Sequence, residues 1–410
     1  MSKPDLPEID VDVPTIDAET LKSRLDAGED TVLLDTRPPA KHDEWRIESP
    51  AATHVNQPYY DYLGEDLTDD HVAELPEDEA FVVLCAKGHS SEFVAAKLQQ
   101  AGYDAVALDE GMEGWARLYE YAELDADADA DATVGQYYRP SSGCLAYLVV
   151  SGDEAAVFDP LRAFTDRYVE DAADYGASIE YVVDTHVHAD HVSGLRELAA
   201  ETGAKTVLSA AAADRGAAFD VDVLVEDSEV RSTSGNRMQS GDGDTLTVGD
   251  IDVEVLATPG HTSGMTSFRV GDVLLTGDGL FTDSVARPDL EEGDDGARDA
   301  ARTLYETIQE TILALPDDTR IAPAHTSGAA DAHEDGTYTA PLGQLLEEME
   351  ALQYDREAFV DYVLADMPPR PANYEEIIET NLGRTDVDDD EAFTLELGPN
   401  NCAAGAAGGD

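Results

Sequence analysis

Short apolar runs alternate with amphipathic segments over the N-terminal part of the chain. Three of these runs predict buried strands, because each is short, mainly apolar and bounded by polar or turn-forming residues: Thr31–Asp35, Phe81–Cys85 and Ala105–Leu108. Ser91–Ala101 has its apolar residues at helical spacing and is followed by Gly102, which predicts a helix that ends there. This order favours a small α/β domain with a mainly parallel sheet.

A second and longer series of strands follows. Leu145–Val150 and Ala155–Phe158 predict a hairpin around an intervening Gly-Asp pair. Three more strands are predicted, each ending at a loop that carries histidine or aspartate: Tyr181–Asp184, Ile251–Leu256 and Val273–Thr276. Beyond Pro341 the pattern becomes helical.

Composition indicates where these parts begin and end. The Asp-Ala alternation of Asp125–Asp131 has a like charge at every second residue and nothing large to bury, which predicts an extended linker. The small, Gly- and Ala-rich end of the chain predicts a flexible tail. We therefore expect an α/β domain at 1–124, an acidic linker at 125–133, a second domain at 134–341, a helical extension at 342–397 and the tail at 398–410.

The chain is strongly acidic, with 25 Lys and Arg against 89 Asp and Glu and a formal net charge of −64. Such a charge repels phosphate backbones and anionic membranes, so we expect neither as a partner. Apolar content of 42% together with patterned segments favours a folded protein, of the kind found in a high-salt, halophilic cytoplasm. The N-terminus has no secretion signal, which predicts a cytoplasmic protein.

Cys85 is the cysteine whose position predicts chemistry. It ends an apolar strand and precedes a loop and a helix, where backbone N–H groups and a helix N-terminus converge. Lys87 and His89 add positive charge, and together these features favour a thiolate or persulfide anion. A buried structural cysteine would fit the position alone equally well. Cys144 is expected in the core, and Cys402 in the tail without a role.

The surrounding domain resembles the rhodanese family. Asp35-Thr36-Arg37 matches the D-x-R signature, Trp45–Ala52 loosely follows a second family segment, and Gly111–Trp115 matches the closing G-x-x-G-W element. The resemblance implies that Cys85 is catalytic and carries sulfane sulfur as a persulfide. It implies a persulfide loop with these members: Lys87, Gly88, His89, Ser90, Ser91, Asp35 and Arg37. Ser90 stands where many members have an arginine, so thiosulfate is not specified as the donor.

Histidine and aspartate gather at the ends of the later strands. Thr185–His191 contains His186, His188, Asp190 and His191 directly after a predicted strand. Downstream strands are followed by the remaining members of the set, His261, Asp278 and His325. The set holds five of the chain's ten histidines, and its residue types are those that ligate metals. This pattern predicts a metal centre.

The H-x-H-x-D-H motif with spaced His, Asp and His resembles the metallo-β-lactamase superfamily from Gly135 to His325. The resemblance implies a four-layer αββα sandwich with its metals at one edge of the two sheets. Glyoxalase-type thioester hydrolases in this superfamily hold two metals through seven such residues: His186, His188 and His261 on one, Asp190, His191 and His325 on the other, and Asp278 between them. Persulfide dioxygenases hold one iron through the equivalents of His186, His261 and Asp278.

Both chemistries fit this set of residues. Two histidines and a carboxylate are typical of non-haem Fe(II) oxygenases and leave positions for dioxygen and a persulfide, whereas a hydrolase would use metal-bound hydroxide. A rhodanese fusion makes chemical sense beside an enzyme that uses persulfides. Arg287, expected to bind a substrate carboxylate or to hold Asp289, lies in a stretch that resembles persulfide dioxygenases. The segment Pro371–Gly383 also resembles a C-terminal element of bacterial rhodanese-associated dioxygenases.

The leading hypothesis is therefore an Fe(II)-dependent persulfide dioxygenase with one iron per chain. It would oxidise a low-molecular-weight persulfide with O₂ to sulfite and a thiol, while Cys85 exchanges sulfur with a thiol, sulfite or thiosulfate. A two-zinc thioester hydrolase is the alternative, followed by a non-catalytic metal fold with a sulfur-relay domain. A homodimer is a possible assembly. The residues do not identify the thiol.

Overall fold

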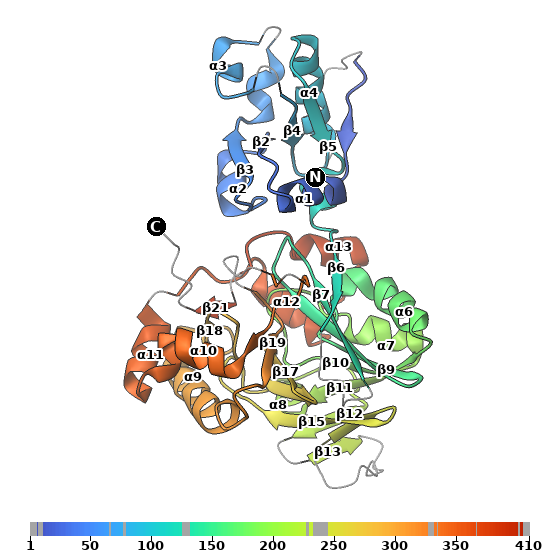
Figure 1. Ribbon diagram of the computed structural model, residues 1–410, viewed down its shortest axis with the longest axis vertical. Coiled ribbons are helices and arrows are strands. Elements are labelled where there is room, and N and C mark those ends of the chain that lie inside the picture. The colour runs from blue at the N-terminus through green and yellow to red at the C-terminus, as the bar shows by residue number, and fades with distance from the viewer. Residues whose placement is uncertain are drawn as a thin grey trace. The chain divides into compact units, whose positions relative to one another are not determined.

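The computed structural model describes residues 6, 11–64, 67–76, 79–124, 132–226, 229–232, 245–326, 332–333, 335–365, 367–400 and 402–404. It forms two compact units, the first built mainly from residues 1–118 and the second from Tyr119 onward (Figure 1). The predicted linker Asp125–Asp131 lies outside the described residues. Among the described residues, no helix combines the length and the apolar content that a bilayer crossing requires.

The first unit contains a five-stranded sheet in the order β1-β5-β4-β2-β3, and all its strand pairs are parallel. The strands are β1 (Thr15–Ile16), β2 (Thr31–Asp35), β3 (Ala52–Asn56), β4 (Phe81–Leu84) and β5 (Ala105–Leu108). The helices are α1 (Ala18–Asp26), α2 (Pro39–Glu44), η1 (Tyr59–Leu63), α3 (Asp69–Val72), α4 (His89–Gln100) and α5 (Gly111–Trp115). The predicted parallel α/β domain is confirmed.

Strand β4 is buried on both faces, which places Cys85 at the carboxyl end of a central strand. Phe81 and Val83 belong to one apolar cluster, and Val82 and Leu84 to another on the opposite face of the sheet. Ligand sites of open α/β sheets lie at such carboxyl ends. Helix α4 begins four residues beyond Cys85, at His89.

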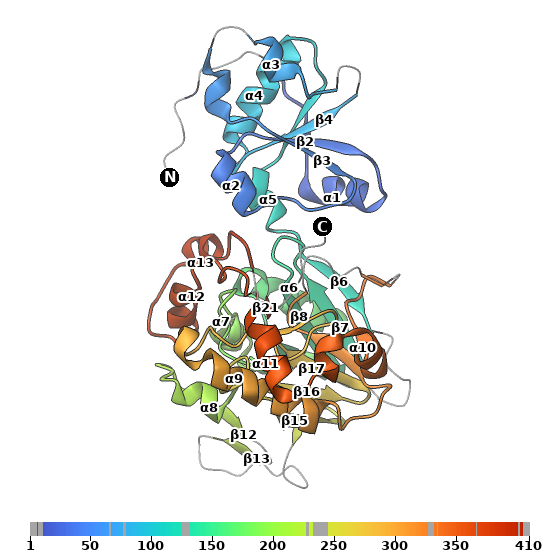
Figure 2. The same ribbon diagram turned by 90° about the vertical axis from the view of Figure 1, so that its left-hand side faces the viewer.

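The second unit contains two large sheets (Figure 2). The eight-stranded sheet has the order β13-β12-β11-β10-β9-β8-β7-β6 and the six-stranded sheet the order β14-β15-β16-β17-β19-β20. The strands of the first are β6 (Glu120–Glu123), β7 (Thr133–Tyr138), β8 (Leu145–Ser151), β9 (Glu154–Phe158), β10 (Ser178–Val183), β11 (Lys205–Ser209), β12 (Val223–Glu226) and β13 (Glu229–Ser232). Those of the second are β14 (Thr245–Val248), β15 (Ile251–Ala257), β16 (Thr266–Val270), β17 (Val273–Gly277), β19 (Arg320–Pro323) and β20 (Ala340–Pro341).

Helices cover the outer face of each sheet, so the unit has four layers. Strand β8 shows why: Leu145 and Tyr147 face the core between the sheets, whereas Ala146 and Leu148 face α6 (Thr165–Asp174) and α7 (Leu195–Thr202). On the far side, the six-stranded sheet packs against the later helices. These are α9 (Gly293–Thr307), η3 (Ile308–Ile312), α10 (Leu342–Glu348), η4 (Glu350–Gln353) and α11 (Arg356–Ala365). The predicted αββα sandwich is confirmed.

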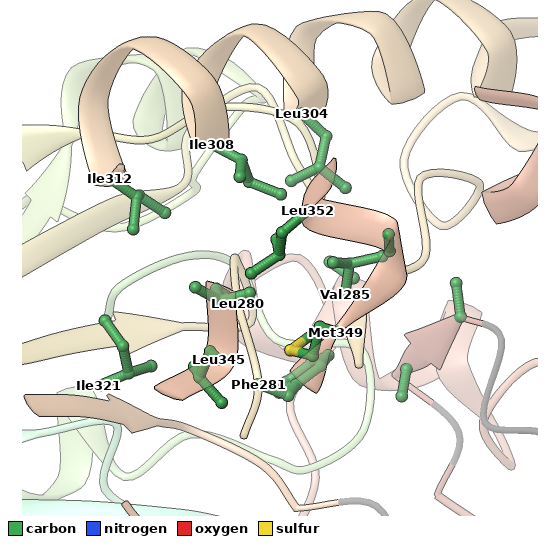
Figure 3. Packing of buried hydrophobic residues seen from close by; sticks show 14 of the residues in the cluster. Leu280, Phe281, Val285, Leu304, Ile308, Ile312, Ile321, Leu345, Met349 and Leu352 are labelled. Atoms are coloured by element: carbon green, nitrogen blue, oxygen red, sulfur yellow. The ribbon is translucent and has the colours of Figure 1, made fainter. Parts of the chain in front are cut away.

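Figure 3 shows the apolar cluster that joins the C-terminal helices to the second sheet. Leu304 and Ile308 of the α9 region meet Leu352 of η4 and Leu280 of the loop after β17. The C-terminal region therefore shares a core with the sandwich. It also contains α12 (Tyr374–Asn381) and α13 (Asp389–Leu395), while α8 (Ala210–Asp214) and η2 (Arg162–Phe164) complete the helices.

Two predicted boundaries need correction. Residues 119–124, assigned to the first domain, include β6, which pairs with β7 and so belongs to the second unit. Thr133, assigned to the linker, already lies in β7.

The predicted flexible tail is also wrong where it is described. Cys402 is 1% exposed, and β21 (Ala403–Ala404) pairs antiparallel with β18 (Val285–Ala286). Small side chains at these positions reflect close packing against the sandwich, not a lack of structure. Residues 401 and 405–410 lie outside the described part.

We predict that Phe268→Ala lowers the free energy of unfolding of the second unit by about 3–5 kcal/mol. Phe268 is fully buried between the sheets, and its ring centroid lies 5.2 Å from that of Phe158. Urea unfolding measures the change. Leu346→Ala, at a side chain that is 37% exposed, is the control and should change stability by less than about 0.5 kcal/mol. Equal effects of the two substitutions would contradict this core.

Candidate metal centre and cysteine loop

The histidine and aspartate set meets where strands of both sheets end. His186–His191 follow β10, His261 follows β15, and His325 follows β19. Asp278 follows β17, where Gly277 has a φ of +53°. A Cβ on Gly277 would lie 2.9 Å from the Cβ of Thr185, so this close approach and the positive φ both favour glycine. Both sheets thus contribute ligands at one edge.

Three of the predicted residues converge on one point. The Nε2 atoms of His186 and His261 lie 3.7 and 3.8 Å from Oδ2 of Asp278. All three side chains are buried, and these three atoms have no hydrogen-bond partner. Buried polar atoms without partners are costly, and atoms at this separation suit a shared cation. The residues therefore fit a metal ion.

The other ring nitrogens of the two histidines are already bonded, which fixes the direction of Nε2. Nδ1 of His261 lies 2.8 Å from the carbonyl oxygen of Arg287, to which only a protonated nitrogen can donate. The Thr185 hydroxyl donates to Asp159 and lies 2.9 Å from Nδ1 of His186, from which it accepts. Such outer contacts orient the rings of metal ligands.

Burial keeps these imidazoles neutral, as metal binding requires. It lowers the pKa of His261 to about 4 and the pKa of His186 well below its usual value, where His188 adds to the effect. Burial and the nearby Asp190 raise the pKa of Asp278 well above its usual value. A bound cation would offset both the repulsion and the loss of water.

Asp190, His191 and His325 form a second group beside the first. Asp190 lies 3.2 Å from Nδ1 of His191 and 3.7 Å from Nδ1 of His325. Both ring nitrogens of His191 and Nδ1 of His325 are buried without hydrogen-bond partners. Oδ2 of Asp190, however, accepts from Asn400 at 2.9 Å and from Cys144 at 3.3 Å.

His188, predicted as a ligand of the first metal, has a different neighbourhood. Its Nε2 lies 3.0 Å from Asp159 and 3.9 Å from Asp184, and its Nδ1 lies 3.8 Å from Asp190. Burial alone lowers the pKa of His188, but these carboxylates outweigh it and raise that pKa to about 10. His188 therefore groups with the carboxylates of Asp159 and Asp184, next to the group of His186, His261 and Asp278.

Two cysteines lie at the centre although sequence reasoning gave them no role. Cys144 is buried as predicted, but its thiol donates to Asp190 and accepts from Asn400 at 3.2 Å. Cys402 lies beside Asp190 and Asp278, and burial followed by these two carboxylates raises the pKa of its thiol well above the usual value. No local pattern distinguishes either cysteine, because their partners are distant in sequence.

The C-terminal region also holds the loop that carries the ligands. Nδ2 of Asn381 donates to the carbonyl oxygens of His188 and His191 at 3.0 and 2.9 Å. Oε1 of Glu396 accepts from the backbone N–H of Val192 at 2.8 Å. Asn381 falls in the C-terminal element noted from the sequence, and the structure shows its contacts.

Arg287 is buried and holds Asp289, the second of its two expected roles. Its guanidinium donates to both carboxylate oxygens of Asp289, at 2.7 and 3.0 Å, and to the carbonyl of Pro369. The expected contact with a substrate carboxylate stays a prediction. Its backbone instead orients His261.

The cysteine loop of the first unit is closely built. Cys85 is buried, and its sulfur lies 3.4 Å from the hydroxyl of Ser91, which donates to the carbonyl of Gly88. Gly111 has a φ of +59°, and a Cβ there would lie 2.2 Å from the Cys85 carbonyl oxygen. The G-x-x-G-W element thus allows the backbone to approach the loop.

Several predicted loop residues have other contacts. Lys87 pairs with Glu113 at 2.6 Å, so its charge is compensated, and His89 is exposed. Asp35 and Arg37 form a buried ion pair at 2.6 Å, with Nδ1 of His42 3.0 Å from Asp35. The ion pair lies at the carboxyl end of β2, whereas Ser91 contacts the Cys85 sulfur.

Comparison with known proteins agrees with both units. The metallo-beta-lactamase superfamily model matches residues 140–325, and the rhodanese-like domain model matches residues 17–118. A hydroxyacylglutathione hydrolase of Methylococcus capsulatus is 32% identical over 248 residues, covering 59% of this chain and 82% of the relative. The chain belongs to the metallo-β-lactamase superfamily. It also carries a rhodanese-like domain.

Other relatives of this superfamily member are persulfide dioxygenases. The human mitochondrial persulfide dioxygenase ETHE1 is 32% identical over 197 residues, covering 46% of this chain. The chain spans 66% of that protein's length. The crystal structure of ETHE1 from Myxococcus xanthus has a TM-score of 0.50 and 26% identity, covering 61% of this chain and 97% of the other.

We predict that Asp159→Asn weakens metal binding by about 10–100-fold. Asp159 accepts from the backbone N–H of Thr185 at 2.7 Å and lies 3.0 Å from Nε2 of His188. In the Asp159→Asn variant the side-chain NH₂ would replace one carboxylate oxygen and could not accept the hydrogen bonds that the carboxylate accepts. Competition with a chelator measures the affinity. Asp153→Asn, at an exposed turn residue, is the control. Unchanged affinity in Asp159→Asn would contradict this role.

Proposed function

We propose that this protein is an Fe(II)-dependent persulfide dioxygenase with a sulfurtransferase domain. The observation that supports it best is the convergence of His186, His261 and Asp278, whose three unpartnered atoms lie within 4.8 Å of one another. Two neutral histidines and one carboxylate on one face are typical of non-haem Fe(II) oxygenases. Similarity to persulfide dioxygenases supports the same choice.

An Fe(II) ion held by these three residues would supply redox chemistry and open positions for dioxygen and a sulfur anion. The protein orients the ligand side chains and excludes water from them. Arg287 and Thr185 hold the rings of His261 and His186, and burial of the three ligand side chains excludes water. Low dielectric strengthens each of these interactions.

The proposed reaction consumes a persulfide anion, dioxygen and one water. The sulfur–sulfur bond breaks, the terminal sulfur is oxidised to sulfite, and dioxygen accepts the electrons. The remaining sulfur leaves as a thiol, and one proton is released. The proposal does not depend on the identity of the thiol.

Cys85 is proposed to carry sulfane sulfur in the first unit. Its place at the carboxyl end of β4, with α4 beginning at His89 and Ser91 beside the sulfur, supports a site for a persulfide anion. A thiol, sulfite or thiosulfate would exchange sulfur with it. Since Lys87 is paired with Glu113 and the Ser91 hydroxyl donates to Gly88, backbone N–H groups are proposed as the main stabilisers of the anion.

A two-metal thioester hydrolase is the second candidate. The unpartnered nitrogens of His191 and His325 favour it, and so does similarity to a hydroxyacylglutathione hydrolase. Against it, Oδ2 of Asp190 already accepts from Asn400 and Cys144, which leaves Oδ1 as the oxygen of that carboxylate open to a second cation. The smaller number of open oxygens favours a single ion.

We predict that native protein contains one iron per chain and consumes oxygen only when a persulfide is present. His261→Ala should abolish this uptake, because it removes one of three ligands. An oxygen electrode and elemental analysis measure both quantities. His54→Ala, in β3 of the first unit, is the matched control and should keep them. Two zinc ions per chain with thioester hydrolysis would instead establish the second candidate.

We also predict that Cys85→Ser abolishes sulfur transfer from a persulfide donor to a small thiol, since a serine hydroxyl forms no persulfide. The rate should fall to that measured without protein. Oxygen uptake with an added low-molecular-weight persulfide should persist in the same variant, which shows that the metal centre is intact. Unchanged sulfur transfer would contradict the role of Cys85.

A further inference from the structure

The C-terminal end of the described chain enters the metal centre. We define the C-terminal strap as Asn400 and Cys402–Ala404. Asn400 donates to Asp190, and Cys402 is 1% exposed. The sulfur of Cys402 and carboxylate oxygens of Asp190 and Asp278 all lie within 4.8 Å of one another. A thiol therefore lies beside a carboxylate of the proposed metal site.

This position is not that of an ordinary core cysteine. Oδ1 of Asp190 and Oδ2 of Asp278 are buried without hydrogen-bond partners. The thiol therefore lies beside two carboxylates, each of which has an oxygen available to bind a cation. The backbone of the strap is also tied to the centre. The N–H of Arg287 donates to the carbonyl of Cys402 at 3.2 Å, and the carbonyl of Arg287 orients His261.

The sulfur is nevertheless too far out to be a further ligand of the same ion. A sulfur bound to that ion would lie within about 4.4 Å of each histidine nitrogen, given usual metal–ligand lengths. Among the described residues, the group that contains both His186 and His261 has Asp278 as its third member and does not include Cys402. The thiol therefore lies beside the ligand Asp278 but outside bonding distance of the ion.

One sulfur atom added to Cys402 could bridge the gap between its Sγ atom and the ion. With a sulfur–sulfur bond of about 2.05 Å, a metal–sulfur bond of about 2.3 Å and the bent angle of divalent sulfur, a Cys402 persulfide bound to the ion would hold Sγ about 3.5 Å from it, beyond direct bonding distance. We propose that Cys402 is the enzyme's own sulfane-sulfur carrier and that its persulfide is the species oxidised at the metal centre. This inference rests on the proposed function and specifies its substrate as a protein persulfide.

The loading step balances without an added oxidant. The sulfur of the Cys402 thiol attacks the sulfane sulfur of a persulfide anion, a new sulfur–sulfur bond forms, and the donor's own sulfur–sulfur bond breaks. The donor takes up the proton of the Cys402 thiol and leaves as a thiol, and Cys402 is left as a persulfide anion. In the second step the Cys402 persulfide, dioxygen and one water give sulfite, the Cys402 thiol and one proton.

Cys402 is buried, so the strap must open locally before its thiol can meet a donor. Strand β21 is a two-residue strand paired only with β18, at Val285–Ala404 and Ala286–Ala403 (Figure 1). The side chains of Ala403 and Ala404 bury little apolar area compared with the large residues of Figure 3. Local opening would break this pairing together with the hydrogen bonds that Asn400 donates to Asp190 and Cys144.

The test uses the full-length, iron-loaded protein without oxygen. Inorganic polysulfide is the sulfur donor, excess donor is removed by desalting, and mass spectrometry of proteolytic peptides locates added sulfur. We expect Cys402 to gain the mass of one sulfur atom, and to lose it with release of sulfite when air is admitted. The Cys85→Ser variant, which lacks the cysteine of the first unit, should do the same.

Cys402→Ser should keep its iron but lose oxygen uptake with any small persulfide, down to the level of His261→Ala. If it keeps oxygen uptake, or if Cys402 gains no sulfur while the wild-type protein consumes oxygen, the carrier is refuted and the dioxygenase stands. If Cys402 gains sulfur that air does not remove, and no persulfide supports oxygen uptake, both are refuted. Iron analysis of Cys402→Ser separates loss of the carrier from loss of the metal.

Discussion

Buried ligand atoms without hydrogen-bond partners are the constraint on which this structure depends. Nitrogen atoms of His186 and His261 and an oxygen of Asp278 are held out of water and away from any protein donor or acceptor. Each such atom costs free energy, commonly about 1–3 kcal/mol. The core between the two sheets and the clusters on their outer faces must stabilise this arrangement until a cation completes it.

The ligands come from loops, and contacts from distant parts of the chain give those loops a defined geometry. Asp159, after β9, holds Thr185 and lies against His188, while Arg287 orients His261. Asn381 of α12 holds the backbone of the ligand loop from the other side. The helical C-terminal region is therefore part of the metal centre's support, which explains why it shares a core with the sandwich.

The two units place related chemistry in one chain. Cys85 follows a central strand of a parallel sheet and precedes helix α4, a position that can stabilise a sulfur anion. The second unit places Cys402 next to the carboxylates of a buried metal site. A small persulfide, a protein persulfide and a redox metal would then form one sulfur-oxidising sequence, in which each step is carried by a different local environment.

Sequence alone determined the elements and the residue types, because both are local. The period of apolar residues predicted β2, β4, β8, β9 and β10, and the spacing of His186–His191 predicted a metal loop at a strand end. Tertiary structure alone decided which atoms meet. Cys144 and Asn400 touch although they are 256 residues apart, and Cys402 is buried where composition predicted a flexible tail. Small residues are common both in disordered tails and in tightly packed segments. Composition therefore cannot distinguish the two, and only the contacts made in the folded protein do.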